Sequence, residues 1–184
     1  MYNVRRSDYD VTNTVRVSSA PDVRDAVRVL VQATWPDIDF TPVARAFDDF
    51  EMAFTGRMPG YFGVDTVYHD QQHTLDVTLA MARLMVGYER VHAGTPQALG
   101  AERAAMGTLL ALFHDIGYLR EQGEAALNGA EFTRNHVSRG ARFLEYYLPT
   151  IGFAHWARTA LYPISRYCPT ASSVSGMSFP FAWP

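Results

Sequence analysis

Hydrophobic residues recur at three- and four-residue spacing along most of this chain, and no segment alternates clearly between polar and apolar positions with a period of two. This spacing predicts amphipathic α-helices. Val23, Val27 and Val31, for example, share one helical face, and proline or glycine stands near the predicted helix ends. The pattern assigns helices to residues 21–34, 41–54, 70–92, 99–113 and 130–147. We therefore expect an all-α fold in the form of one helical bundle.

The length of the chain sets the expected domain organisation. A chain of 184 residues can bury about two thirds of its unfolded surface in one domain with a real core. Residues 1–20 mix Thr, Ser, Val and Asp without a steady period, so we expect a poorly ordered or adaptable N-terminal arm. Residues 21–158 are the expected helical domain, and residues 159–184 are a separate tail.

The tail differs from the rest of the chain in composition. From Thr159 onward Arg166 is the only charged residue, and four prolines stand among Ser, Phe and Trp. Such a sequence specifies neither a stable helix nor a solvated linker. An uncharged aromatic end of this kind must pack, meet a partner or cause self-association. An altered or truncated C-terminus is the other explanation that the composition leaves open.

Composition and charge exclude several classes of function. The chain has 48% hydrophobic residues, 19% charged residues and a net charge of -3, which indicates a globular protein whose main partner is neither a nucleic acid nor an acidic membrane. Cys168 is the only cysteine, so an intramolecular disulfide and a cysteine-based zinc cluster are excluded. Residues 1–10 lack the apolar core of a signal peptide or a spanning helix. A cytoplasmic location is the default expectation.

Histidine and aspartate occur together in two short helix-forming segments. Tyr68-His69-Asp70-Gln71-Gln72-His73 places two imidazoles four residues apart, and the adjacent pair His114-Asp115 lies in an apolar run some forty residues later. Residues i and i+4 share one helix face, so His69 and His73 are expected to face one cavity. Buried titratable groups are costly unless they pair or bind metal, which makes a divalent-metal site the first hypothesis. Imidazole and carboxylate donors suit Zn, Mn, Fe, Ni or Mg alike.

These segments resemble the HD superfamily of metal-dependent phosphohydrolases. Residues 68–77 are similar to the Tyr-His-Asn-x-x-His-Ala-x-Asp-Val signature of class I cyclic-nucleotide phosphodiesterases, except at its third and seventh positions. His114-Asp115 matches the pair that names the superfamily, and residues 135–141 resemble its later histidine helix. The resemblance covers about residues 68–148, and the combined order and spacing make it specific. It implies an all-α HD domain.

The resemblance also implies a role for each side chain. His73, His114 and Asp115 would bind the principal metal ion. His69 and Asp115 would be the catalytic residues, His69 as proton donor to the leaving alkoxide and Asp115 as a ligand able to bridge to a second ion. His136 would be a second-metal ligand or a phosphate contact. The cations available for a phosphate's remaining charge are Arg120, Arg134 and Arg139.

The expected function is therefore hydrolysis of a phosphomonoester or phosphodiester with one or two divalent metal ions as cofactor. The expected substrate is a nucleotide or another small phosphorylated metabolite. One departure from the family pattern matters: a further metal-binding Asp usually follows the histidine helix, yet no Asp occurs from Asn135 to Pro184. Water, Glu145, an N-terminal carboxylate or His155 could complete the shell.

That departure keeps two other functions open. The main alternative is a catalytically weak or dead metal-binding HD module with a regulatory or interaction role. A helical oxygenase with a mixed-valent di-iron site is the third. Some of the singled-out side chains also have a plainer interpretation, because a histidine or arginine on a solvated helix face is common. This applies to His136, Arg134 and Arg139.

Overall fold

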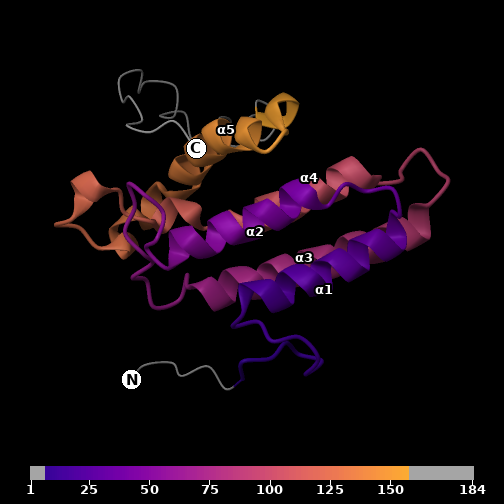
Figure 1. The fold of residues 1–184 in the computed structure, drawn as a ribbon, viewed down its shortest axis with the longest axis horizontal. Helices are drawn as coiled ribbons and strands as arrows, with labels where there is room; N and C mark the ends of the chain where they lie inside the picture. The colour runs from indigo at the N-terminus through magenta and orange to yellow at the C-terminus, as the bar shows by residue number, and fades with distance from the viewer. Residues whose placement is uncertain (1–6, 158–184) are drawn as a thin grey trace. The chain divides into compact units, whose positions relative to one another are not determined.

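The computed structural model describes residues 7–157, and every regular element in that range is a helix (Figure 1). The expectation of an all-α fold is therefore confirmed for the described residues. The first four helices along the chain are α1 (Ala20–Thr34), α2 (Thr41–Phe54), α3 (Gln71–His92) and α4 (Ala101–Leu112). Three short 3₁₀ helices and one α-helix follow: η1 (Ile116–Tyr118), η2 (Gln122–Glu124), η3 (Gly129–Arg134) and α5 (His136–Thr150). The predicted tail, residues 159–184, lies outside the described residues.

The chain divides into two compact units. The first comprises Met1–Glu51 and Gln71–Leu112, and the second comprises Met52–Asp70 and Phe113–Pro184. Along the chain, α2 begins in the first unit and ends in the second. Among the helices of residues 7–157, none has the combination of length and hydropathy that is needed to cross a membrane.

In the first unit, α3 packs against both α1 and α4. α1 begins where the Ser19 side chain accepts a hydrogen bond from the backbone N–H of Asp22, with Pro21 in the first turn. The helices bury the faces that the hydrophobic spacing predicts. The buried side chains include Val23, Val27 and Val31 of α1 and Leu75, Leu79, Ala82, Met85 and Val86 of α3.

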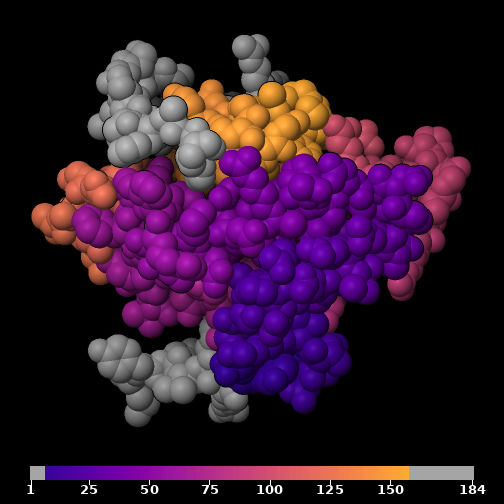
Figure 2. Space-filling model, viewed as in Figure 1, coloured from indigo at the N-terminus to yellow at the C-terminus, as the bar shows by residue number. Residues whose placement is uncertain are grey.

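A buried carboxylate organises the segment before α1. Asp10 accepts hydrogen bonds from the backbone N–H groups of Thr12, Thr14 and Val15. It also forms an ion pair of 2.8 Å with Arg83 of α3. Burial raises the pKa of Asp10, but these hydrogen bonds outweigh it and hold the pKa well below its usual range. Residues 7–19 are therefore attached to the first unit although their sequence shows no period. In Figure 2 the indigo N-terminal part of the chain forms one continuous surface.

In the second unit, α5 packs against η1 and also contacts η3. Phe113, Phe143 and Tyr147 form a buried aromatic cluster, with ring centroids 4.9 to 5.4 Å apart. Backbone hydrogen bonds join residues 60–62 to residues 120–122. The aromatic cluster and these bonds support the turn that follows α4.

The end of α4 differs from the prediction. α4 ends at Leu112, so His114 and Asp115 lie in the turn between α4 and η1 and not within a helix. The hydrophobic run that predicted a helix to 113 continues through Ile116, because the turn itself is buried. Hydrophobicity alone therefore could not mark where the helix stops.

The predicted helix 130–147 is also divided. η3 and α5 meet at Asn135, whose N–H donates to the Phe132 carbonyl. The hydroxyl of Ser138 donates to the Asn135 carbonyl. Local side-chain bonds of this kind compete with a continuous helical ladder. Pro149 lies in the last turn of α5 and not after its end.

Candidate functional site

The carboxylate of Asp115 is the centre of the candidate site. Asp115 precedes η1 and is only 3% exposed, whereas His69 and His114 are half-buried. Its Oδ2 atom lies 2.8 Å from Nδ1 of His69 and 3.1 Å from Nε2 of His114. One oxygen therefore accepts from two imidazoles that come from separate segments of the second unit.

The position of Asp115 in a turn explains the second contact. Neighbouring side chains on a regular helix diverge by about 100°, which would separate His114 from the carboxylate next to it. Past the end of α4 the backbone leaves that geometry, and the imidazole can reach the adjacent side chain. The turn thus brings together the side chains of His114 and Asp115, which an uninterrupted helix would hold apart.

The electrostatic environment keeps Asp115 ionised. Burial raises the pKa of this carboxyl group, but hydrogen bonds from His114 and His69 and the charges of their imidazoles outweigh it. The net effect lowers the pKa of Asp115 from 3.8 to about 2. At neutral pH the site therefore presents a buried anion bordered by nitrogen donors, and a cation could replace the protons between them.

The ring of Tyr118 links two of the predicted site histidines. It stacks on His69 with a centroid distance of 4.2 Å and on His136 with a centroid distance of 4.4 Å. Tyr118 itself is 3% exposed, so its position is fixed by packing. The sequence analysis assigned no role to Tyr118, although its position three residues after Asp115 was a usable signal.

His136 lies at the start of α5 and is half-buried. Its Nδ1 atom is 2.9 Å from the carbonyl oxygen of Thr133, and its ring centroid is 6.3 Å from that of His69. The structure therefore brings His136 into the same group of rings as His69. Its role as a second-metal ligand or phosphate contact stays a prediction.

His73 lies in the first turn of α3, in the first unit, and is half-buried. Its role as a metal ligand stays a prediction. Imidazole and carboxylate donors suit borderline or hard divalent ions such as Zn, Mn, Fe, Ni or Mg, and the identity of the ion stays open.

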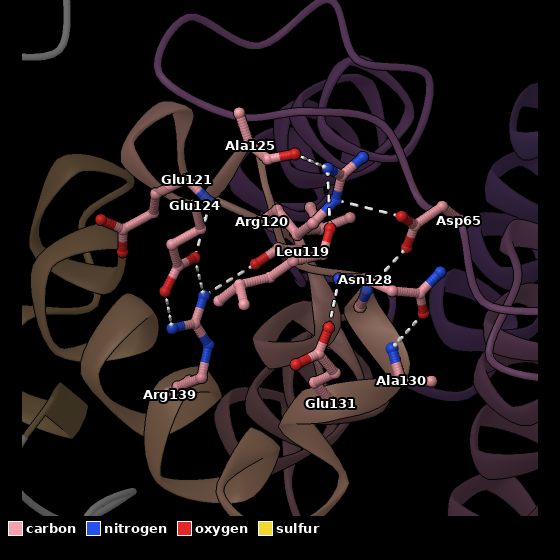
Figure 3. A network of polar contacts seen from close by, with 12 residues as sticks. Asp65, Leu119, Arg120, Glu121, Glu124, Ala125, Asn128, Ala130, Glu131 and Arg139 are labelled. Carbon is pink, nitrogen blue, oxygen red and sulfur yellow. Dashed lines mark hydrogen bonds and ion pairs between the residues drawn. The ribbon is translucent and has the colours of Figure 1, made fainter.

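Arg120 has a structural role within the second unit. Its Nε atom lies 3.0 Å from Oδ2 of Asp65, and its NH1 group donates to the carbonyls of Ala125 and Leu127 (Figure 3). The guanidinium also lies over the ring of Phe62, 4.8 Å from its centroid. The Arg120 guanidinium is thus already bound by groups of the surrounding loop. The prediction that Arg120 binds phosphate has no support in this arrangement.

Arg139 is engaged even more fully. Its guanidinium makes two hydrogen bonds of 2.8 Å to the carboxylate of Glu124 and donates to the carbonyl of Leu119 (Figure 3). It also donates to the carbonyl of Gly117. It also stacks over Phe132 at 3.8 Å. A phosphate contact would require Arg139 to give up these partners, and the prediction gains no support here either.

Arg134 differs from the other two predicted cations. It ends η3 and is exposed. Within residues 7–157 it forms no ion pair, so its charge is open to a ligand from solution. Its exposure fits a solvated helix face equally well.

The candidates for the missing carboxylate are exposed. Glu145 lies on the solvent side of α5, and His155 follows the end of that helix and is exposed as well. Neither shares the burial of Asp115. The described residues therefore offer no second buried acid from α5 or the segment after it.

The comparisons with known proteins are negative. No family model matches this chain, and no curated protein or solved structure matches it significantly.

Proposed function

We propose that this chain is a metal-dependent phosphohydrolase that cleaves a phosphomonoester or phosphodiester. The observation that carries the proposal is the buried Oδ2 atom of Asp115, which lies within 3.1 Å of ring nitrogens from both His69 and His114. A buried carboxylate with a pKa near 2 remains an anion at neutral pH. Such a group next to imidazole nitrogens is typical of a cation site.

The proposed ligands of the ion are His73, His114 and Asp115. His73 follows His69 by four residues, so the covalent chain keeps the Cα atoms of the two residues within about 14 Å of each other. When bound, a divalent ion supplies a water of lowered pKa and polarises a phosphoryl oxygen. The mixed donor set leaves the identity of the ion open.

His69 is the proposed proton donor to the leaving group. Its Nδ1 atom is engaged by Asp115, and its ring face is held against Tyr118. Both contacts restrict the rotation of the imidazole and so direct its second nitrogen. A histidine fixed in this way can deliver a proton to a departing alkoxide with little reorganisation. Arg134 is the proposed contact for the phosphate's remaining charge.

A second candidate function is a metal-binding module without significant turnover. It is favoured by the exposure of Glu145 and His155, two of the side chains that were expected to complete the shell. Two imidazoles and one carboxylate leave the other coordination positions to water, which lowers affinity relative to a full shell. With either function, the chain is therefore expected to lose its metal on dialysis against a mild chelator.

Elemental analysis of the full chain, combined with phosphatase and phosphodiesterase assays, separates the two functions. The hydrolase is expected to cleave at least one substrate class, to lose activity with chelator and to regain it with added Mn²⁺ or another divalent ion. The variant Asp115→Asn removes the central anion with little change in shape and should abolish both metal binding and turnover. Metal binding without hydrolysis of any substrate would favour the second function. A chain that binds no divalent ion would refute both.

A further inference from the structure

The side chain of Arg139 in α5 forms hydrogen bonds to the turn that carries Asp115. Arg139 donates from Nε to the carbonyl of Gly117 and from NH2 to the carbonyl of Leu119, with both bonds at 2.9 Å. These two carbonyls lie in and directly after η1, two and four residues beyond Asp115. A 3₁₀ turn is held by hydrogen bonds of poorer geometry than those of an α-helix. Arg139 therefore supplies donors where the turn itself is weakly held.

Glu124 fixes the orientation of the Arg139 guanidinium. The two side chains form a two-pronged pair, with NH1 to Oε1 and NH2 to Oε2 both at 2.8 Å. The same carboxylate accepts from the backbone N–H of Glu121 at 2.9 Å, in a capping box at the start of η2. Because Glu124 is itself anchored, the pair can hold the guanidinium in one plane.

Contact between the main chains of the turn and of α5, next to the Arg139–Glu124 pair, leaves the turn little room to shift. At Gly117 an added Cβ atom would collide with the carbonyl oxygen of His136 and would lie 2.8 Å from the nitrogen of Gly140. The turn and the first residues of α5 thus touch through their main chains. A substitution of Arg139 is therefore expected to shift Asp115 and the stacked rings of Tyr118 and His136.

From these contacts we propose that Arg139 and Glu124 are positioning residues for the metal site. They hold the turn so that the Asp115 carboxylate and the Tyr118 ring keep their places relative to His69 and His136. Within the described residues, all hydrogen bonds of the Arg139 side chain go to Gly117, Leu119 and Glu124, so the pair acts through the turn and not on a substrate. The inference rests on the proposed function, because the consequence of positioning is read at the metal ligand Asp115.

The test uses Co²⁺, whose visible absorption reports the geometry of its ligands, with the full chain and two conservative variants. Arg139→Lys keeps the charge and loses the planar fork, and Glu124→Gln keeps the shape and loses the charge. Both are expected to weaken Co²⁺ binding about 10- to 100-fold and to change the spectrum at saturating metal. In Arg139→Ala, added guanidinium ion should restore part of the affinity and the parent spectrum. A merely structural role would not produce this rescue.

The matched control is Arg142→Lys, which makes the same substitution one turn further along α5. It should leave the affinity and the spectrum as in the parent chain. Amide hydrogen exchange of residues 113–120 gives a readout that needs no metal, and it should accelerate in Arg139→Lys but not in Arg142→Lys. Unchanged exchange in this segment, or unchanged Co²⁺ affinity and spectrum in a parent chain that binds Co²⁺, would overturn the positioning role. If the parent chain binds neither Co²⁺ nor any other divalent ion, the proposed function fails, and the exchange data alone still decide whether Arg139 holds the turn.

Discussion

Nδ1 of His69 lies 2.8 Å from Oδ2 of Asp115, although 46 residues separate the two along the chain. His69 ends a loop of the second unit, and Asp115 belongs to the turn after α4. The contact gives the carboxylate one partner from a distant segment in addition to its neighbour His114. Each member of this trio depends on the others, so the loss of any one has a consequence that can be measured.

Replacing His114 by Ala should remove most of the bound metal. The substitution deletes a proposed ligand and leaves the buried Asp115 with one imidazole fewer to offset its charge. We expect a loss of metal affinity of at least about tenfold, measured by elemental analysis after gel filtration. His92→Ala is the control, because His92 is the last residue of α3 and its ring contacts that of Tyr88 at a centroid distance of 4.1 Å. Stoichiometric metal retained by His114→Ala would contradict the ligand assignment.

Replacing His69 by Ala separates proton donation from metal binding. If His69 is the general acid, the variant should keep its metal and lose roughly 10²- to 10⁴-fold in turnover on a substrate with a poor leaving group. On an activated aryl phosphate, which needs no protonation, the loss should be much smaller. The measurement is kcat on both substrates at saturating metal. Equal losses on the two would argue against the acid role.

The low pKa of Asp115 predicts a pH dependence of stability. The folded pKa is about 2 and the ordinary value is 3.8, so the carboxylate stabilises the folded state above about pH 4. The stabilisation, on the order of 2 kcal/mol, is lost as the pH falls towards 2. Urea unfolding of the parent chain and of Asp115→Asn should therefore show a stability difference that narrows between about pH 5 and pH 2. A difference that does not change over this range would show that Asp115 titrates normally.

The fold could be predicted from the sequence where burial follows a helical period. Val23, Val27 and Val31 are buried as their spacing predicts, and so is the stripe of α3 from Leu75 to Val86. The prediction failed where tertiary contacts decide the backbone. The helix was expected to reach 113 because the apolar run continues, but the buried turn after Leu112 is held by groups such as Arg139 that lie far away in the sequence.

The site was predictable in its donor types and less so in its geometry. The residues around His69 and Asp115 were singled out from their order and spacing, and the structure joins these two side chains directly. The stacking of Tyr118 between two histidines has no periodic signal, because it depends on how η1 meets α5. Arg139 was expected on a solvated face or at a phosphate, since a sequence does not reveal that Glu124 lies opposite it.

Gly117 lies where the main chain of the turn meets the main chain of α5. Gly117→Ala should destabilise the chain by about 1–3 kcal/mol or more, because the new methyl group would meet the main chain of His136 and Gly140, which cannot rotate away. Gly123→Ala is the matched control, since a Cβ atom added there has no neighbour within 4 Å, and it should change stability by less than about 0.5 kcal/mol. Urea unfolding of both variants measures the difference. Because the same shift would displace Asp115, metal affinity should fall in Gly117→Ala and stay unchanged in Gly123→Ala. Equal stability of the two variants would show that the turn can move away from α5, and the rigid placement of the carboxylate would then have to be abandoned.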